Sequence, residues 1–306
     1  MELRAIGSLR VSLVGLGCNN FGMRIDEAAT KRVVDTALDV GINFFDTADI
    51  YGSTKSEEYL GRALATRRHQ AVVATKFGMA VDDQRKGARP EYVRRACDDS
   101  LKRLGTDYID LYQLHQPDPS VPIADTLGVL NDLVKAGKVK EVGCSNFSAE
   151  QLDEASRAAK PGAAKFVSVQ NEYSLLHREP EKSVLAACDR LSLGFLPYFP
   201  LASGLLTGKY EPGKPAPKDS RLSLSWTSRF TTDKNVEIAE ALKAFAAARR
   251  HTLLELAFSW LAARPQIASV IAGATSPDQI RANAAAVTWS LTRDDLAEID
   301  RIAPRS

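Results

Sequence analysis

Residues 44–51 read FFDTADIY, residues 71–76 read AVVATK and residues 109–115 read IDLYQLH. Each stretch begins with the apolar residues of a buried β-strand and ends on an ionisable side chain. Strands that are apolar almost throughout are typical of parallel sheets whose two faces are covered. We therefore expect each stretch to form one strand of an α/β fold.

Short apolar strands alternate with amphipathic helices along the 306-residue chain. The candidate strands are Leu13–Gly17, Asn43–Asp46, Val72–Lys76, Ile109–His115, Val139–Cys144, Phe166–Gln170, Gly194–Pro200 and Ser269–Gly273. Apolar residues three or four apart predict helices between them, and eight strand–helix units close a barrel. The sequence predicts one (β/α)8 TIM barrel domain over residues 1–306, with an N-terminal β-hairpin (Leu3–Ile6 and Leu9–Val11) and a last helix at Asp294–Ile302.

An open, doubly wound sheet is the alternative fold. It usually begins with a Gly-rich turn that enters a helix at once. Residues 15–20 read GLGCNN, which lacks the third glycine of that fingerprint. Residues 204–210, GLLTGKY, do not have the spacing of a phosphate-binding P-loop. The barrel is the better interpretation.

The bulk composition excludes several functional classes. With 40 basic and 38 acidic residues, the net charge of +2 gives no basic surface for nucleic acid or anionic lipid. No apolar run approaches the ~18 residues that span a membrane. The four cysteines form no CxxC pair, so we expect neither a metal site nor a disulfide framework. Glu2, Arg4 and Arg10 interrupt the apolar core that a signal peptide needs, which favours the cytoplasm.

Four side chains at strand ends predict a catalytic site. The downstream strand ends of a barrel open onto one face, so Asp46, Tyr51, Lys76 and His115 should converge there. We expect the Lys76 ammonium to lower the pKa of Tyr51, Asp46 to hold Lys76, and His115 to donate a hydrogen bond to a substrate oxygen. This set can protonate the alkoxide that forms when hydride reaches a carbonyl. None of the four supplies hydride, so a nicotinamide cofactor is implied.

Each of these residues also has a purely structural interpretation. Asp46 can cap a loop, Tyr51 can pack beside a glycine, and His115 can be a satisfied rim histidine. Lys76 at the end of a buried strand is harder to explain, because lysine is rarely buried unpaired. The four together favour chemistry over structure.

The same segments resemble the aldo-keto reductase superfamily, and within it the branch that contains the potassium-channel β-subunits. The motifs that carry the resemblance run in order along nearly the whole chain: GSLRVSLVGLGCNNFG, NFFDTADIYG, VVATKFG, DLYQLHQPD, VGCSNFS, QNEYSLL, PYFPLASGLLTGKY and VIAGATSPDQIRAN. The resemblance implies a (β/α)8 barrel that reduces an aldehyde or ketone with NADPH. Tyr51 resembles the general acid, Lys76 and Asp46 its tuning pair, and His115 the group that orients the carbonyl.

The resemblance also implies a set of cofactor-binding residues. They are Gly17, Asp46, Ser145, Asn146, Gln170, Tyr198, Leu201, Ser203, Gly204, Leu206, Lys209, Arg221, Gly273, Thr275, Gln279 and Asn283. Tyr198 resembles the aromatic residue that stacks on the nicotinamide, and Arg221, which is otherwise a solvated surface arginine, resembles a basic residue that closes over the phosphates. Many members carry Lys and Arg for the 2′-phosphate where this chain has Gly273 and Gln279. NADPH remains the expected cofactor, with NADH as the alternative.

The substrate pocket is expected on loops of the same face. Its predicted walls are Asn20, Phe21, Tyr51, Phe77, His115, Phe147 and Trp226. A small-molecule carbonyl is the expected partner. Two other functions stay open: an NAD(P)-dependent alcohol or sugar dehydrogenase, and a cofactor-sensing regulatory protein like a channel β-subunit. In the β-subunits Asn replaces the carbonyl-orienting His, whereas this chain has His115.

Overall fold

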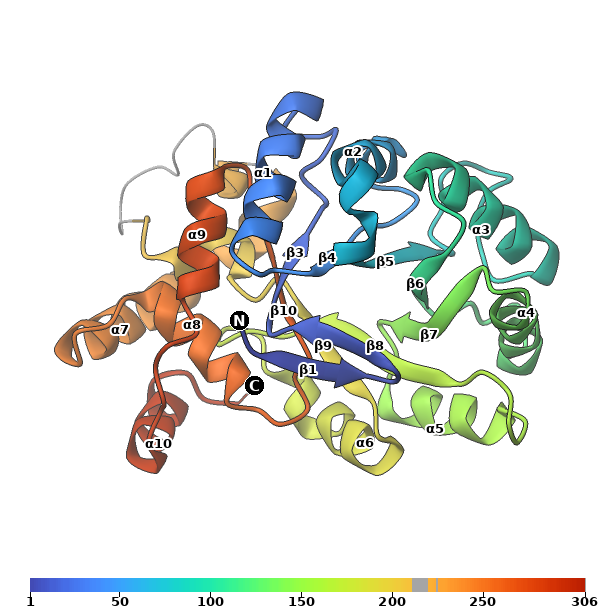
Figure 1. The fold of residues 1–306 in the computed structure, drawn as a ribbon. Helices are drawn as coiled ribbons and strands as arrows, with labels where there is room; N and C mark the ends of the chain where they lie inside the picture. Colours follow the sequence, from blue (N-terminus) through green and yellow to red (C-terminus); the bar gives the residue numbers. More distant parts are fainter. Residues whose placement is uncertain (211–219, 224, 306) are drawn as a thin grey trace.

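The structure is a computed structural model that describes residues 1–210, 220–223 and 225–305, without the side chains of residues 225 and 226. The chain begins with an antiparallel hairpin, β1 (Leu3–Ile6) and β2 (Leu9–Ser12), which ends one residue later than predicted. Ile6, Leu9 and Val11 of the hairpin are buried against residues of the barrel strands, such as Phe44 and Leu111. The hairpin therefore closes one end of the barrel and leaves the other end for a site (Figure 1).

Within the described residues, eight parallel strands form the barrel predicted from the sequence (Figure 1). They are β3 (Val14–Gly17), β4 (Phe44–Asp46), β5 (Val72–Phe77), β6 (Ile109–Leu114), β7 (Val139–Ser145), β8 (Phe166–Glu172), β9 (Gly194–Tyr198) and β10 (Val270–Gly273). From β3 to β9 each strand pairs with the next in chain order, and β10 pairs with β3. The ring is nearly closed, because Phe195 of β9 exchanges hydrogen bonds with Gln266 and Ala268, just before β10.

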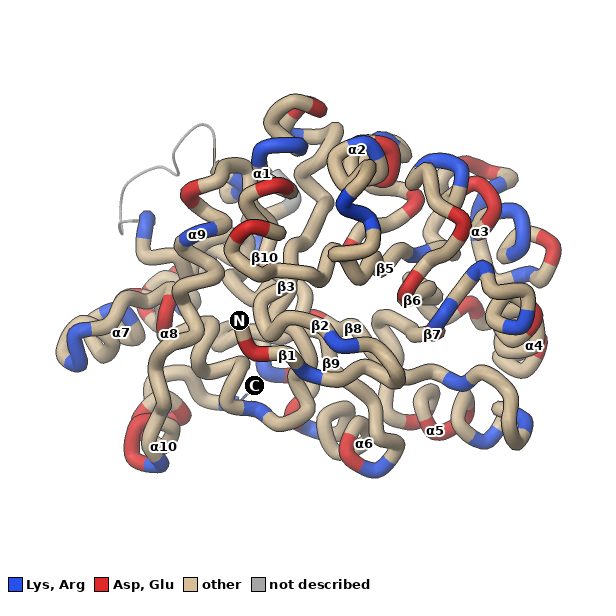
Figure 2. The backbone as a smooth tube through the Cα atoms, viewed as in Figure 1, with Lys and Arg blue, Asp and Glu red and all other residues tan. Residues whose placement is uncertain are grey.

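Helices pack around the outside of the sheet (Figure 1). The α-helices are α1 (Glu27–Asp39), α2 (Lys55–Leu64), α3 (Pro90–Leu104), α4 (Ile123–Lys135), α5 (Ala149–Ala158), α6 (Val184–Leu191), α7 (Asp233–Ala248), α8 (Leu253–Ala262), α9 (Pro277–Ala285) and α10 (Arg293–Ile302). The 3₁₀ helices are η1 (Ala65–Gln70), η2 (Glu179–Lys182), η3 (Ala202–Thr207), η4 (Arg221–Ser223) and η5 (Ser225–Phe230). Basic and acidic residues are interspersed over the outer helices (Figure 2).

Local sequence signals account for several helix ends. Pro90 is the first residue of α3, where its missing N–H costs nothing, and Gly105 ends the same helix in the left-handed region at φ 63°. Ser148 and Gln151 form a capping box at the start of α5. These signals set where α3 begins and ends and where α5 begins.

Strand ends differ from the prediction by one or two residues. β9 ends at Tyr198 rather than Pro200, because Phe199 has φ 51°, a value that breaks a strand. β8 continues to Glu172 instead of ending at Gln170. The segment between β9 and α7 contains η4 and η5, while 211–219 and 224 lie outside the described residues. No helix in the described part of the chain is both long and apolar enough to span a membrane.

Candidate active site

A cavity of about 990 Å³ lies at the downstream ends of the barrel strands. Gly17, Asp46, Ser145 and Tyr198 line it from the ends of β3, β4, β7 and β9, and His115 lines it from the residue after β6. The strand ends that the sequence singled out therefore do face one space. This is the end of the barrel opposite the hairpin.

Asp46 and Lys76 form a fully buried ion pair in the floor of this region. Lys76 Nζ donates to Asp46 Oδ2 at 2.7 Å and to the carbonyl of Thr47 at 2.8 Å. The other oxygen of Asp46 accepts from Gln170 Nε2 at 2.9 Å and from Gln113 Nε2 at 3.2 Å. Burial by itself lowers the pKa of Lys76, but Asp46 and Tyr51 outweigh it and leave that pKa raised. The ammonium is thus held charged and fixed in direction.

Tyr51 stands directly above this pair. Lys76 Nζ lies 3.5 Å from the Tyr51 hydroxyl, within reach of a long hydrogen bond. The rings of Tyr51 and His115 meet edge to face with centroids 5.9 Å apart. The loop turns sharply after Tyr51, since Gly52 has φ 58° and a Cβ there would collide with the carbonyl of Phe21. The glycine in the FFDTADIYG motif therefore serves the placement of the phenol.

The net pKa of Tyr51 differs from the expectation. Burial raises the pKa of this phenol, and although Lys76 acts in the opposite direction, burial wins. The prediction that Lys76 makes the pKa of Tyr51 lower than usual is therefore wrong for the net shift, although Lys76 does act in that direction. The hydroxyl keeps its proton at neutral pH, which is the form that donates a proton.

His115 is neutral in this setting. Burial, followed by the positive charge of Lys76, lowers the pKa of its imidazole well below the usual value. Its Nδ1 has no hydrogen-bond partner among the described residues. Its backbone carbonyl accepts from Asn146 Nδ2 at 2.9 Å, which ties the end of β6 to the end of β7. A neutral imidazole can still donate one N–H to a ligand oxygen.

A second polar network continues the cavity wall away from Tyr51. The hydroxyl of Tyr198 donates to Asn146 Oδ1 at 2.8 Å, and Asn146 Nδ2 donates to Ser145 Oγ at 3.1 Å. Ser145 Oγ in turn donates to the carbonyl of Gln170 at 2.7 Å. Asn146 adopts φ 62°, which asparagine tolerates better than most residues. The network fixes an amide and an aromatic ring beside the ion pair.

The next part of the wall is built from backbone rather than side chains. Ala202, Ser203 and Gly204 all have positive φ, and the N–H groups of Ala202 and Gly204 donate within this turn to the carbonyls of Phe199 and Leu201 at 2.9 and 2.8 Å. Lys209 and Arg221 line the same part of the cavity, together with Leu201. Burial, with a contribution from Arg24, lowers the pKa of Arg221 to about 10, so the guanidinium stays charged at neutral pH.

The far end lies at β10 and the start of α9. Thr275 donates to Gln279 Oε1 through its backbone N at 2.8 Å and its hydroxyl at 3.2 Å. Ser276 caps α9 by accepting from the Gln279 backbone N–H. Gly273 and Asn283 complete this wall. None of these five residues is charged, as the sequence indicated.

The cavity fits a nicotinamide dinucleotide. Buried polar atoms without a partner among the described residues face this region, namely Asn20 Oδ1, Ser203 Oγ and His115 Nδ1. At Gly273 a Cβ would come within 3.1 Å of Asn20 Nδ2, so the glycine keeps the backbone open. A pocket lined by amide groups, an aromatic ring, small residues of a tight turn and the two cations Lys209 and Arg221 supplies what the parts of such a cofactor require.

Four predicted residues are placed elsewhere by the structure. Phe21, Phe77, Phe147 and Leu206 are buried in the hydrophobic core and do not line the cavity. Phe77 packs on Tyr112 with ring centroids 4.7 Å apart, and Phe147 packs edge-on against Phe166. A neighbouring position in the sequence does not fix the direction of a side chain, so these four lie in the core beside the site residues. The side chain of Trp226 lies outside the described residues.

Several cavity residues are absent from the sequence-based prediction. They are Asn19, Met23, Arg24, Ile50, Gly52, Met79, Gln116, Phe199, Pro200, Thr207, Tyr210, Ser220, Leu254, Ile271, Ala272 and Ala282. Ile50, Gln116 and Phe199 directly neighbour predicted residues, so a wider window around each strand end would have included them. Leu254 comes from α8 and has no such signal, because only the tertiary fold brings it to the cavity.

Comparisons with known proteins extend over the same residues. A model described as "Aldo/keto reductase family" matches residues 13–304. "Probable aldo-keto reductase 1" of Glycine max is 36% identical over 305 residues, covering 96% of this chain and 86% of the relative. "Probable voltage-gated potassium channel subunit beta" of Oryza sativa subsp. japonica is 35% identical over 298 residues, covering 92% and 90%. The solved structure of a glycerol dehydrogenase from Gluconobacter oxydans has a TM-score of 0.85 at 31% identity, covering 98% of this chain and 94% of that one.

Proposed function

The chain belongs to the aldo/keto reductase family and is an NAD(P)H-dependent oxidoreductase, and on this premise we propose that it reduces a small aldehyde or ketone to an alcohol with NADPH. The observation that carries the proposal is the Asp46–Lys76 pair, 2.7 Å apart, beneath the Tyr51 hydroxyl, 3.5 Å from Lys76 Nζ. The four residues Asp46, Tyr51, Lys76 and His115 are called the tetrad below.

The tetrad divides the proton chemistry among its members. A bound nicotinamide cofactor supplies hydride from C4 of its ring. Tyr51, which keeps its proton because burial raises its pKa, donates that proton to the substrate oxygen. Lys76 stabilises the phenolate that remains, and Asp46 fixes Lys76. His115, neutral because its pKa is lowered, donates a hydrogen bond that orients the carbonyl oxygen.

The remaining lining residues are assigned to the cofactor. Ser145, Asn146 and Gln170 would hold the carboxamide, and Tyr198 would cover one face of the nicotinamide ring. Gly17, Leu201, Ser203, Gly204, Lys209 and Arg221 would surround the pyrophosphate. Thr275, Gln279 and the N-terminus of α9 would receive the adenosine 2′-phosphate, with Gly273 and Asn283 beside the adenosine. The hydroxyl, the amide and the helix dipole replace the usual cations there.

The direct test is loss of NADPH fluorescence with a panel of aldehydes, ketones and sugars, in the wild type and in Tyr51→Phe. Removing the general acid should lower kcat by about 10²–10⁴-fold. Dissociation constants for NADPH should stay within about twofold, because the ring of Tyr51 remains. Unchanged turnover in Tyr51→Phe would refute the assigned acid, and a wild type without turnover on the whole panel would refute the reductase proposal.

A second candidate is the reverse reaction, oxidation of a small polyol. It is favoured by the glycerol dehydrogenase among the structural neighbours. Oxidation needs Tyr51 as phenolate, and its raised pKa makes that form scarce at neutral pH. The rate of glycerol oxidation should therefore rise by up to tenfold per pH unit above neutrality. A rate that is already maximal at neutral pH would contradict this assignment.

A further inference from the structure

Asp49 is a buried acid in the loop that carries Tyr51. It lies two residues before Tyr51, between β4 and α2, and its side chain is 2% exposed. Its backbone N–H donates to the carbonyl of Lys76 at 3.2 Å. The backbone of the loop is thus attached to β5 at the lysine of the tetrad.

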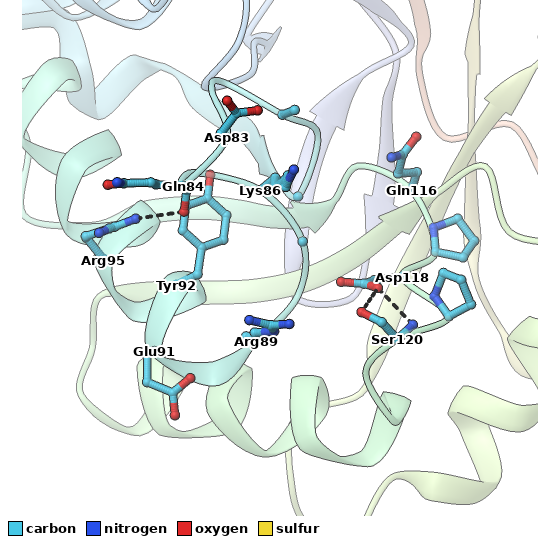
Figure 3. A pocket seen from close by; sticks show the side chains of 15 residues that line it. Asp83, Gln84, Lys86, Arg89, Glu91, Tyr92, Arg95, Gln116, Asp118 and Ser120 are labelled. Atoms are coloured by element: carbon cyan, nitrogen blue, oxygen red, sulfur yellow. Dashed lines mark hydrogen bonds between the residues drawn. The ribbon is translucent and has the colours of Figure 1, made fainter.

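The carboxyl group of Asp49 has one hydrogen-bond partner from outside its own loop. The hydroxyl of Tyr92, on α3, donates to Asp49 Oδ2 at 3.4 Å, and Asp49 Oδ1 has no partner among the described residues. Tyr92 also lines a second cavity of about 760 Å³, beside Lys86, Arg95 and Asp118 (Figure 3). Tyr92 therefore separates that cavity from the loop of Tyr51.

A second buried acid shares this region. Glu57 of α2 is fully buried, and it accepts from Arg103 Nε of α3 at 2.6 Å and from the hydroxyl of Thr75. One cation, Arg103, thus faces two carboxyl groups, those of Asp49 and Glu57. With Glu57 ionised, charge balance favours Asp49 in its protonated form.

We propose that Asp49 and Tyr92 are a positioning pair for Tyr51, and that the protonated form of Asp49 is the one that keeps the Tyr51 hydroxyl beside Lys76. The inference rests on the proposed function, because Tyr51 is taken as the proton donor. Ionisation of Asp49 adds a second negative charge beside Glu57, and the loop relieves it by moving. Because Asp49 and Tyr51 share that loop, the phenol moves as well.

The surroundings of Asp49 give it a pKa in a different pH range from the pKa values of Tyr51 and His115. Burial and then Glu57 raise the pKa of Asp49 to about 7, while Arg103 and Tyr92 oppose this shift. Facing groups on neighbouring elements are Glu57 of α2, Arg103 and Tyr92 of α3, and Tyr112 of β6. The pKa values of Tyr92 and Tyr112 are raised by burial, that of Tyr51 is also raised, and that of His115 lies well below 6.5. A kinetic inflection near pH 7 would therefore report Asp49.

The test is the single-turnover rate of NADPH oxidation with 4-nitrobenzaldehyde between pH 5.5 and 9. The wild-type rate should fall about fivefold across an inflection near pH 7, because misplacement of a catalytic group slows the chemical step. Asp49→Asn, which stays neutral, should show no inflection and keep KM within about twofold. Tyr92→Phe should keep the inflection but move it to higher pH, since the lost hydrogen bond favours the charged form.

A matched control is Asp110→Asn. Asp110 is equally buried but lies at the start of β6, at the hairpin end of the barrel, where it binds Arg68 and Lys140. This variant should lose stability and retain the inflection. If Asp49→Asn retains the inflection, or if Tyr92→Phe leaves its pH unchanged, the positioning pair is refuted while the reductase function stands. A wild type inactive with every carbonyl would refute both.

Discussion

Different kinds of interaction form the two ends of the cavity. At the Tyr51 end, a buried lysine and a buried aspartate form a short ion pair, and four polar contacts fix them. At the α9 end, uncharged groups, backbone turns and one helix terminus form the wall. Removing one member of a buried charge pair leaves an uncompensated charge and costs several kcal/mol. Removing one of many neutral contacts costs about 1 kcal/mol. Substitutions should therefore have large effects at the first end and small ones at the second.

The largest effect is expected for Lys76→Met. It leaves the Asp46 carboxylate buried without its cation, which costs about 3–5 kcal/mol of unfolding free energy. Turnover should fall about 10²–10⁴-fold as well. Urea unfolding and carbonyl reduction measure the two. The double variant Asp46→Asn/Lys76→Met should recover much of the stability and none of the turnover.

Lys138→Met is the matched surface control. Lys138 pairs with Asp98, and both side chains are largely exposed, so the cost should stay below about 1 kcal/mol. An equal cost at the two sites would remove the contrast between the buried pair and an ordinary one.

The next effect concerns stability against pH at Asp49. Its folded-state pKa of about 7 lies above the ordinary value of 3.8 for an aspartate, so the folded protein binds the extra proton between these values. The stability contributed by that proton is present at low pH and is lost as the pH rises to 7. At pH 8, Asp49→Asn should therefore have an unfolding free energy, measured with urea, about 2–4 kcal/mol above that of the wild type. At pH 4 the two unfolding free energies should be nearly equal. A variant less stable than the wild type at pH 8 would contradict this sign.

In the part of the cavity that Arg221 lines, Arg221→Ala should weaken NADPH binding about tenfold to a hundredfold. This is the usual loss for one charge-assisted hydrogen bond. Binding of NADH should weaken by a similar factor, because Arg221 is assigned to the pyrophosphate, which both cofactors carry. Fluorescence titration gives both dissociation constants. Arg281→Ala is the control, because Arg281 lies on α9 but pairs with Asp278 in solvent. A larger loss in Arg281→Ala would place the phosphate on the outer face of α9.

The smallest effect is expected for Tyr198→Phe, which keeps the ring and removes its hydrogen bond to Asn146. One neutral hydrogen bond corresponds to about twofold to tenfold in the dissociation constant of the cofactor. Tyr198→Ala should cost clearly more, because the ring is lost too. Equal effects of the two substitutions would mean that stacking contributes nothing.

The sequence was most informative where strand periodicity and chemistry coincide. Asp46, Lys76 and His115 end or follow apolar strands, and parallel strands bring such ends together, so their convergence follows from the fold class. Phe21, Phe77 and Phe147 are neighbours of site residues too, yet they point into the core. Phe77 is the last residue of β5, where the alternation of a strand turns it away from the face that Lys76 occupies. Phe21 and Phe147 follow β3 and β7, and there the turn sets the direction of the side chain.

By itself, the sequence predicted the barrel, its order of strands and the meeting of Asp46, Tyr51, Lys76 and His115 at one end of it, because these depend on local patterns repeated along the chain. Only the tertiary structure decided the balance of burial against charge. Burial raises the pKa of Tyr51 despite Lys76 and brings that of Asp49 to about 7 beside Glu57. Desolvation depends on every atom packed around a group, and those atoms come from distant parts of the chain.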